Sequence, residues 1–121
     1  MVKTGLNKSD EEVVDLLIDM GLSRKTARTL TYLSQVGETQ SRNIERFTEL
    51  RQPEVSTAIK ELKSKGWVKK RDIKKEGKGR PIHAYSLTVP LNVAIKSIVS
   101  SKKSEIERIE ANIKRLRELT K

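Results

Sequence analysis

The side chains of this chain that are best placed to do chemistry are hydroxyls, amides and cations, and they gather between residues 51 and 80. From Pro53 to about Lys65 the apolar residues repeat with the period of an α-helix, so one face of that helix should be buried. The opposite face carries small hydroxyls and one cation. Such a face permits close approach to base edges in a DNA major groove, where Gln, Ser and Thr can donate or accept hydrogen bonds. On this reasoning, the candidate base-reading residues are Gln52, Ser56 and Thr57.

A cationic hairpin is expected directly after this helix. Residues 67–73 and 82–87 are typical of strands, and the loop Lys74–Pro81 between them contains two glycines that permit a turn. Like charges on such a short hairpin repel one another unless an anionic partner meets them. Its lysines lie where DNA phosphates could be neutralised, and an arginine near the tip could probe the minor groove. The candidate residues for the DNA backbone and the hairpin are Lys63, Lys69, Lys70, Lys74, Lys75, Lys78 and Arg80.

The distribution of charge also favours a polyanionic partner. The 121 residues include 26 Lys and Arg against 16 Asp and Glu, a net charge of +10. Residues 1–50 hold 7 basic and 8 acidic groups, residues 51–90 hold 11 and 4, and residues 91–121 hold 8 and 4, so the net charges are −1, +7 and +4. A basic part beside a neutral part indicates a binding face. On charge alone, a merely soluble basic protein is the alternative.

The chain offers little for catalysis or metal binding, and we expect neither an enzyme nor a cofactor. It has no cysteine, which excludes disulfides and thiolate metal sites and fits a reducing, cytoplasmic location. The single histidine, His83, cannot assemble a zinc site by itself and is expected to be a strand residue that faces solvent or the hairpin. The GKGR run at residues 77–80 lacks the spacing of a phosphate-binding loop. We also expect neither a signal peptide nor a membrane span, since no run of about 18 apolar residues occurs.

Three further helices are expected before residue 50. Ser9 and Glu12 have the spacing of a capping box, which predicts a helix that starts at about residue 10. Ser23 and Ser41 are expected to cap the next two helices, with a short strand between them.

From Pro90 the chain is expected to be helical to its end. Its apolar residues keep a three–four spacing over about three heptads, interrupted by Lys102, which favours a coiled coil between two copies. Packing back on its own domain is the alternative. The elements together predict a mainly α fold with a small β-hairpin, organised as a domain over residues 1–89 and a dimerisation helix over residues 90–121. The expected dimer seam consists of Ile95, Val99, Ile106, Ile109, Ile113 and Leu116.

Residues 20–90 resemble the winged helix-turn-helix of the archaeal TrmB-like and MarR-like transcriptional regulators. The likeness lies in four stretches of the sequence: GLSRKTAR, GETQSRNIE, PEVSTAIKELKSKG and GRPIHAY. It implies a protein that binds operator DNA as a homodimer and, as in many members, responds to a small-molecule effector. It also implies that Arg80 enters the minor groove and that the turn before Pro53 and the early part of the next helix touch bases. The base-contact set that the resemblance implies is Arg51, Gln52, Ser56, Thr57 and Lys60.

Three functions stay open on the sequence. The first, which we favour, is a dimeric, sequence-specific regulator that occupies promoter DNA. The second is a largely non-specific architectural DNA-binding protein. The third is a protein–protein adaptor of the transcription machinery that docks through its neutral first two helices. One acidic residue, Glu54, lies close to the expected DNA contacts, and we interpret it as a partner of the helix N-terminus.

Overall fold

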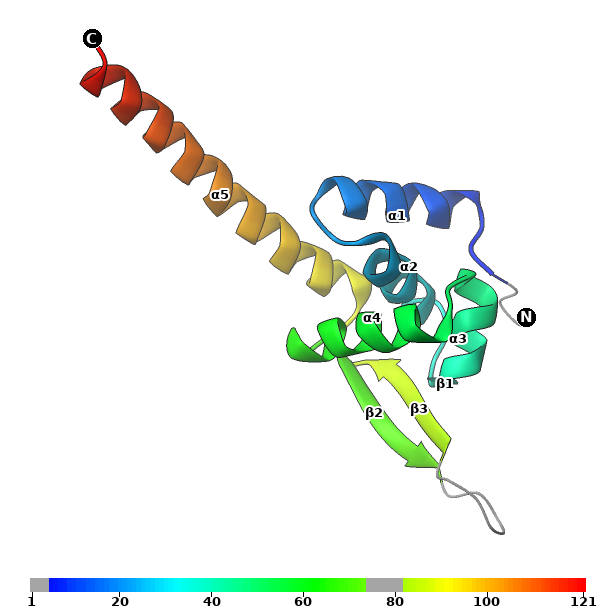
Figure 1. Ribbon diagram of the computed structural model, residues 1–121. Coiled ribbons are helices and arrows are strands. Elements are labelled where there is room, and N and C mark those ends of the chain that lie inside the picture. The colour runs from blue at the N-terminus through cyan, green and yellow to red at the C-terminus, as the bar shows by residue number, and fades with distance from the viewer. Residues whose placement is uncertain (1–4, 74–81) are drawn as a thin grey trace. The chain divides into compact units, whose positions relative to one another are not determined.

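The computed structural model describes residues 5–73 and 82–121 of the protein (Figure 1). The chain divides into two compact units, Met1–Leu91 and Asn92–Lys121, and each is described by itself. The mainly α fold with a small hairpin that the sequence predicts is confirmed. Along the chain the elements are α1 (Lys8–Asp19), α2 (Arg24–Leu33), β1 (Thr39–Gln40), α3 (Ser41–Thr48), α4 (Gln52–Ser64), β2 (Val68–Ile73), β3 (Ile82–Leu87) and α5 (Leu91–Leu119).

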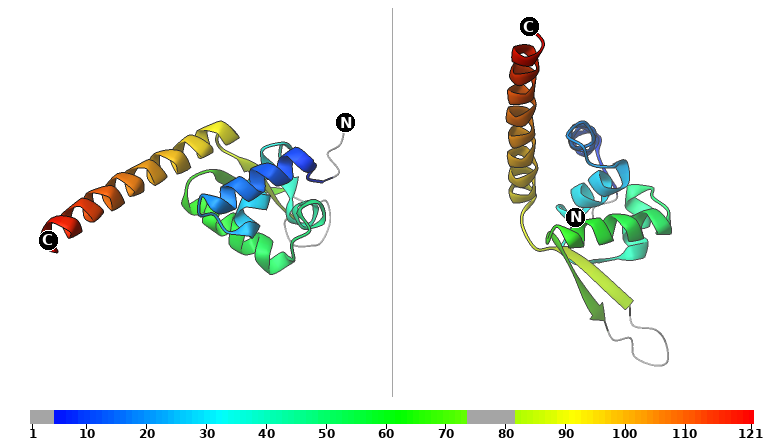
Figure 2. Two further views of the ribbon diagram at one scale, coloured as in Figure 1. Left: turned by 90° about the horizontal axis from the view of Figure 1, so that it is seen from above. Right: turned by 60° about the vertical axis from the view of Figure 1, so that its left-hand side comes forward.

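The sheet is a hairpin with one short additional strand. Its order is β1-β3-β2, and both pairings are antiparallel. The right-hand view of Figure 2 shows β2 and β3 running side by side away from α4. Gly66, with a φ of 79°, lies between α4 and β2 in the left-handed region that a glycine adopts readily. The chain therefore passes from the end of α4 into the hairpin through a single turn, which keeps the two elements close together.

The core of the first unit is built from the apolar faces of its helices. In α4 the buried residues are Val55, Ala58, Ile59 and Leu62, which is the face that the helical period predicts. Leu30 and Ile44 are fully buried on α2 and α3. Burying one face of α4 against these helices leaves its other face to solvent.

Helix α2 is the most buried element, and a charged side chain ties its neighbours together. The Arg28 side chain is only 6 % exposed. Its Nε donates to the Thr48 carbonyl at 2.7 Å, and its Nη1 donates to the Glu11 carboxylate at 2.7 and 2.9 Å. Arg28 thus links α2 to α1 and to the end of α3. A buried cation needs such partners, because an unpaired charge in the interior is costly.

Two helix starts differ from the sequence prediction. Helix α1 is capped by Asn7 and not by Ser9: Asn7 Oδ1 accepts from the Asp10 amide at 2.9 Å, and Asp10 Oδ2 accepts from the Asn7 amide at 2.8 Å. The Gln35 side-chain amide donates to the same Asp10 carboxylate, so a contact with the region after α2 supports the earlier start.

The start of α3 also differs. Ser41 was expected as its cap, but Ser41 is the first residue of the helix and Gln40 occupies the cap position without a side-chain hydrogen bond. The reason is the sheet: Gln40 is still paired with Ala84 of β3, so the helix begins directly where β1 ends.

The second unit is a single long helix, the greater part of α5. Four apolar residues of the expected seam lie on it at 44 to 60 % exposure, namely Ile106, Ile109, Ile113 and Leu116. Lys102, the polar residue within that seam, pairs with Glu105 at 3.1 Å. Within residues 5–73 and 82–121, every helix is too short or too polar to span a bilayer.

Candidate nucleic-acid interface

Helix α4 presents a polar face to solvent. The four side chains Gln52, Ser56, Thr57 and Lys60 are exposed, as is Arg51, which immediately precedes the helix. All five expected base-contact residues are therefore accessible to a partner. The small side chains of Ser56 and Thr57 leave this part of the helix backbone open to close approach by a partner.

Both carboxylates of α4 have partners within the protein. The Arg51 backbone N–H donates to Glu54 Oε1 at 3.0 Å, which confirms the interpretation of Glu54 as a partner of the helix N-terminus. The hydroxyl of the buried Thr26 on α2 donates to the Glu61 carboxylate. This second bond holds α4 to α2 through a side chain at the edge of its exposed face.

Thr57 has a local partner that limits what it can offer. Its hydroxyl donates to the Pro53 carbonyl at 3.0 Å. The hydroxyl has only one proton, so in this rotamer it can only accept a further hydrogen bond. Toward a base edge, Thr57 would accept from an amino group or place its methyl group against a thymine methyl.

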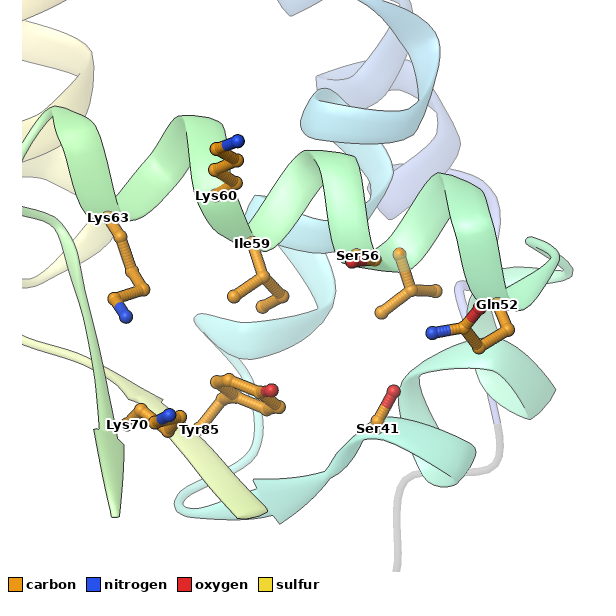
Figure 3. A pocket seen from close by; sticks show the side chains of 9 residues that line it. Ser41, Gln52, Ser56, Ile59, Lys60, Lys63, Lys70 and Tyr85 are labelled. Carbon is orange, nitrogen blue, oxygen red and sulfur yellow. The ribbon is translucent and has the colours of Figure 1, made fainter. Parts of the chain in front are cut away.

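A hollow of about 240 Å³ lies between α4, the start of α3 and the β2–β3 hairpin (Figure 3). Three of its lining residues are lysines, and none is acidic. In Figure 3, Lys63 and Gln52 lie along α4, while Lys70, Tyr85 and Ser41 lie across from them. The full lining is Ser41, Gln52, Val55, Ser56, Ile59, Lys60, Lys63, Lys70 and Tyr85.

The polar side chains of this hollow are available to a partner. Neither the Ser41 and Tyr85 hydroxyls nor the Lys63 and Lys70 ammonium groups make a hydrogen bond or ion pair with any described residue. Elsewhere on the hairpin, charged groups do pair: His83 Nδ1 lies 2.7 Å from Asp72 Oδ1. The hollow therefore concentrates unused donors and positive charge.

A second hollow of about 460 Å³ adjoins the first and shares three of its residues, Ser41, Gln52 and Tyr85. Its other lining residues include Arg42 and His83. Sequence reasoning did not single out Ser41, Tyr85 or Arg42 as part of a binding surface. The alternation of the strands could have indicated Tyr85, whereas Ser41 and Arg42 join the surface only through the tertiary fold.

The two neighbouring lysines of β2 lie on opposite faces of the hairpin, because successive strand residues point to opposite sides. Lys70 is paired with Tyr85 and lines the first hollow, whereas Lys69 is paired with Ser86. Of the expected backbone-contact lysines, Lys63 and Lys70 are thus brought together and Lys69 is not. Lys74, Lys75, Lys78 and Arg80 lie outside the described residues.

Arg71, the next residue of β2, is held by an acidic partner. Its Nε donates to Glu38 Oε2 at 2.8 Å, and a second guanidinium nitrogen donates to Glu38 Oε1. The hydrogen bond lowers the pKa of Glu38 and raises that of Arg71. The pair links Glu38, the residue before β1, to β2 across the central strand β3.

Tyr85 is suited to donate a hydrogen bond. Partial burial, and the negative charge of Asp72 on the neighbouring strand, raise the pKa of its phenol above the ordinary value. As with any tyrosine, the phenol carries its proton at neutral pH and can donate it to an acceptor that enters the hollow.

Comparison with protein families agrees with the interpretation of α3, α4 and the β2–β3 hairpin as a winged helix-turn-helix. A family model described as the MarR family matches residues 20–79, which run from the end of α1 through α4 and β2. The chain is a MarR-like winged helix-turn-helix protein. In this MarR-like protein α3 and α4 form the helix-turn-helix, and β2 and β3 form the wing.

Solved structures share the fold of the MarR-like protein. A possible transcriptional regulator from Methanosarcina mazei Go1 is similar at 15 % identity and a TM-score of 0.63, covering 87 % of this chain and 86 % of the other. Staphylococcus aureus MepR, solved in a DNA-binding conformation, gives 16 % identity and a TM-score of 0.53, with 94 % and 91 % coverage. No curated protein gave a significant sequence match.

A third similar structure is TrmBL2, an archaeal chromatin protein with a novel mode of DNA binding. Its identity to the MarR-like protein is 25 % and the TM-score is 0.61. The similarity covers 92 % of the MarR-like chain and 40 % of TrmBL2, so the chain corresponds to less than half of that protein.

Proposed function

We propose that the protein is a dimeric, sequence-specific regulator that binds double-stranded DNA and acts by occupying promoter sites. The observation that carries this proposal is the exposed face of α4 beside a hollow lined by three lysines and no acidic residue. The net charge of +7 over residues 51–90 supports a polyanion as its partner. The possible transcriptional regulator from Methanosarcina mazei and MepR, which was solved in a DNA-binding conformation, share this fold.

In this proposal, base reading and backbone contact are made by different side chains. Gln52, Ser56 and Thr57 read base edges in the major groove, assisted by Arg51 and Lys60. Two of the lysines around the hollow, Lys63 and Lys70, neutralise phosphates and fix the orientation of α4 without reading sequence. Lys63 and Lys70 are the best placed of the described lysines for that task.

We propose that α5 pairs two copies of the chain. Its seam residues Ile106, Ile109, Ile113 and Leu116 are exposed at heptad spacing, and pairing would remove them from water. A two-fold dimer would present two copies of α4 to one side of a duplex. The half-sites should then lie about 34–36 Å apart, one helical turn of DNA.

The proposal is tested by selecting bound fragments from the source genome and then titrating a selected duplex against random competitor. A specific regulator should prefer the selected duplex by a factor of about 10³ or more. Its selected sites should also show two-fold symmetry. In a Gln52→Ala variant the base preference should change, whereas Lys63→Gln should weaken selected and random duplexes alike. Equal effects of both variants on both duplexes would argue against base reading.

A second candidate is architectural, largely non-specific DNA binding, which the similarity to the chromatin protein TrmBL2 favours. The same titration separates the two, because an architectural protein should bind selected and random duplexes with similar affinity. A small-molecule effector remains a prediction of the family resemblance, since no described hollow indicates its chemistry.

A further inference from the structure

The hollow beside α4 has the chemistry of an oxyanion site. Two ammonium groups, from Lys63 and Lys70, and two hydroxyls, from Ser41 and Tyr85, line it without a hydrogen-bond partner among the described residues. All four can donate hydrogen bonds, and the lining holds no carboxylate that would repel an anion. Charge-assisted hydrogen bonds of this kind are stronger than those between neutral groups.

The two hydroxyls are held on rigid parts of the fold. Tyr85 lies on the central strand β3, between Thr39 of β1 and Lys70 of β2, and Val55 of α4 lines the same hollow. Ser41 is the first residue of α3, whose N-terminus has no side-chain cap. The free amides and the dipole of that helix end add positive potential on the side of the hollow where Ser41 lies. These positions are set by the sheet and by a helix start, so an anion would meet donors that need little ordering.

We propose that Ser41 and Tyr85, together with Lys63 and Lys70, hold one backbone phosphate of the bound duplex between α4 and the wing. This inference rests on the proposed function, since it names the group of the DNA that occupies the hollow. The phosphate fixes the depth of α4 in the groove and therefore the register in which Gln52 and Ser56 meet base edges. Tyr85 and Ser41 are positioning residues in this account and do not read the sequence.

The protonation state of the Tyr85 phenol agrees with this role. A tyrosine phenol is protonated at neutral pH, and the raised pKa of Tyr85 does not change this, so the hydroxyl can donate to a phosphate oxygen. Asp72, which contributes to that shift, lies on the same face of the hairpin and is 2.7 Å from His83 Nδ1. The nearest described acidic group on that face therefore already has a partner.

The test is phosphate ethylation interference with the full-length protein on a duplex that it binds, comparing Tyr85→Phe and Ser41→Ala with the wild type. The wild type should show strong interference at one phosphate per half-site, and each variant should show weaker interference there because one of its four contacts is lost, while the remaining positions stay unchanged. Each variant should lose about 10-fold in affinity, as expected for a hydrogen bond to a charged group. Since neither change removes a charge, the salt dependence should keep its slope, whereas Lys70→Gln should reduce it by about 0.9.

Ser86→Ala is the matched control, because Ser86 neighbours Tyr85 in the strand and faces Lys69 on the other side. It should leave both the interference pattern and the affinity unchanged. Thermal unfolding of each variant establishes that the domain remains folded.

The outcomes separate this inference from the proposed function. If the wild type does not bind duplex DNA, the proposed function fails and this inference with it. If the wild type binds but Tyr85→Phe and Ser41→Ala keep the full interference pattern and stay within about twofold in affinity, the regulator stands and the phosphate site is overturned. Inorganic phosphate at constant ionic strength is the second probe. If it perturbs the Tyr85 and Ser41 resonances while neither variant alters the interference pattern, the hollow is a site for a free anion, which also overturns the inference.

Discussion

Lys70 and Tyr85 lie directly opposite each other in the register of β2 and β3, on the face of the hairpin that borders α4. The adjacent Lys69 lies opposite Ser86 on the other face. These two neighbouring residues are therefore chemically identical but lie on opposite faces of the hairpin. The strand geometry makes them a matched pair for separating contact with DNA from general positive charge.

The first prediction concerns this pair. Lys70→Gln should weaken binding to all duplexes and lower the slope of log affinity against log salt by about 0.9, because one phosphate contact is lost. Lys69→Gln removes the same charge on the other face and should leave the slope nearly unchanged. Fluorescence anisotropy over a range of salt concentrations measures both. Identical slopes for the two variants would mean that the hairpin contributes only a diffuse field.

The second prediction concerns the buried Arg28. Replacing it by methionine removes the bond to the Thr48 carbonyl and leaves that acceptor unpaired. Arg28→Met should therefore lower the free energy of unfolding by about 2–3 kcal/mol. Glu11→Gln should cost only about 1 kcal/mol, since the partly exposed glutamine keeps a carbonyl oxygen that can accept from Arg28. Urea unfolding measures both. A loss of less than about 0.5 kcal/mol for Arg28→Met would show that the link between the helices is dispensable.

The third prediction concerns Glu38, whose pKa the hydrogen bond from Arg71 lowers below the ordinary value of 4.5. A carboxyl whose pKa is lowered by folding stabilises the folded state above its unfolded pKa, and this contribution disappears as the pH falls through the lowered value. The wild type should therefore be slightly more stable than Glu38→Gln at neutral pH, with the difference vanishing in acid. The effect should be small because the pair is exposed. Urea unfolding at both pH values checks the sign. A difference that persists in acid would exclude the ion pair as its cause.

The fourth prediction concerns the seam of α5. Ile109→Asp places a charge in the expected dimer contact, whereas Ala111→Asp places the same charge on the other side of the helix. Burying one isoleucine contributes about 1.5–3 kcal/mol, and a symmetric dimer loses two, so Ile109→Asp should weaken dimerisation at least about 100-fold. Sedimentation equilibrium measures this, and Ala111→Asp should remain dimeric. A wild type that is monomeric at all concentrations would overturn the pairing of α5.

The parts of the fold that could be predicted from the sequence were those with a strong local signal. The buried face of α4 and Ser23 as the cap of α2 each follow from the period or the capping preference of a few residues. The capping box at Ser9 was wrong because Asn7 and Asp10 offered a competing box two residues earlier. A contact between Asp10 and Gln35, distant in sequence, supports that choice.

The candidate site was only partly predictable, for the same physical reason. Gln52 and Ser56 could be named because they lie on one helix. Ser41 reaches the same hollow only because β1 pairs with β3 and sets the start of α3 beside α4. Which of Lys69 and Lys70 faces the hollow depends on the register of the hairpin, and this register cannot be deduced from the composition of the strand.

The most direct test of the account is the affinity of the purified protein for a duplex oligonucleotide as the salt concentration is raised from low ionic strength. The account predicts clear binding in low salt and a linear fall of log affinity with log salt, with a slope that reports several phosphate contacts. Absence of binding to any duplex at low ionic strength would contradict it.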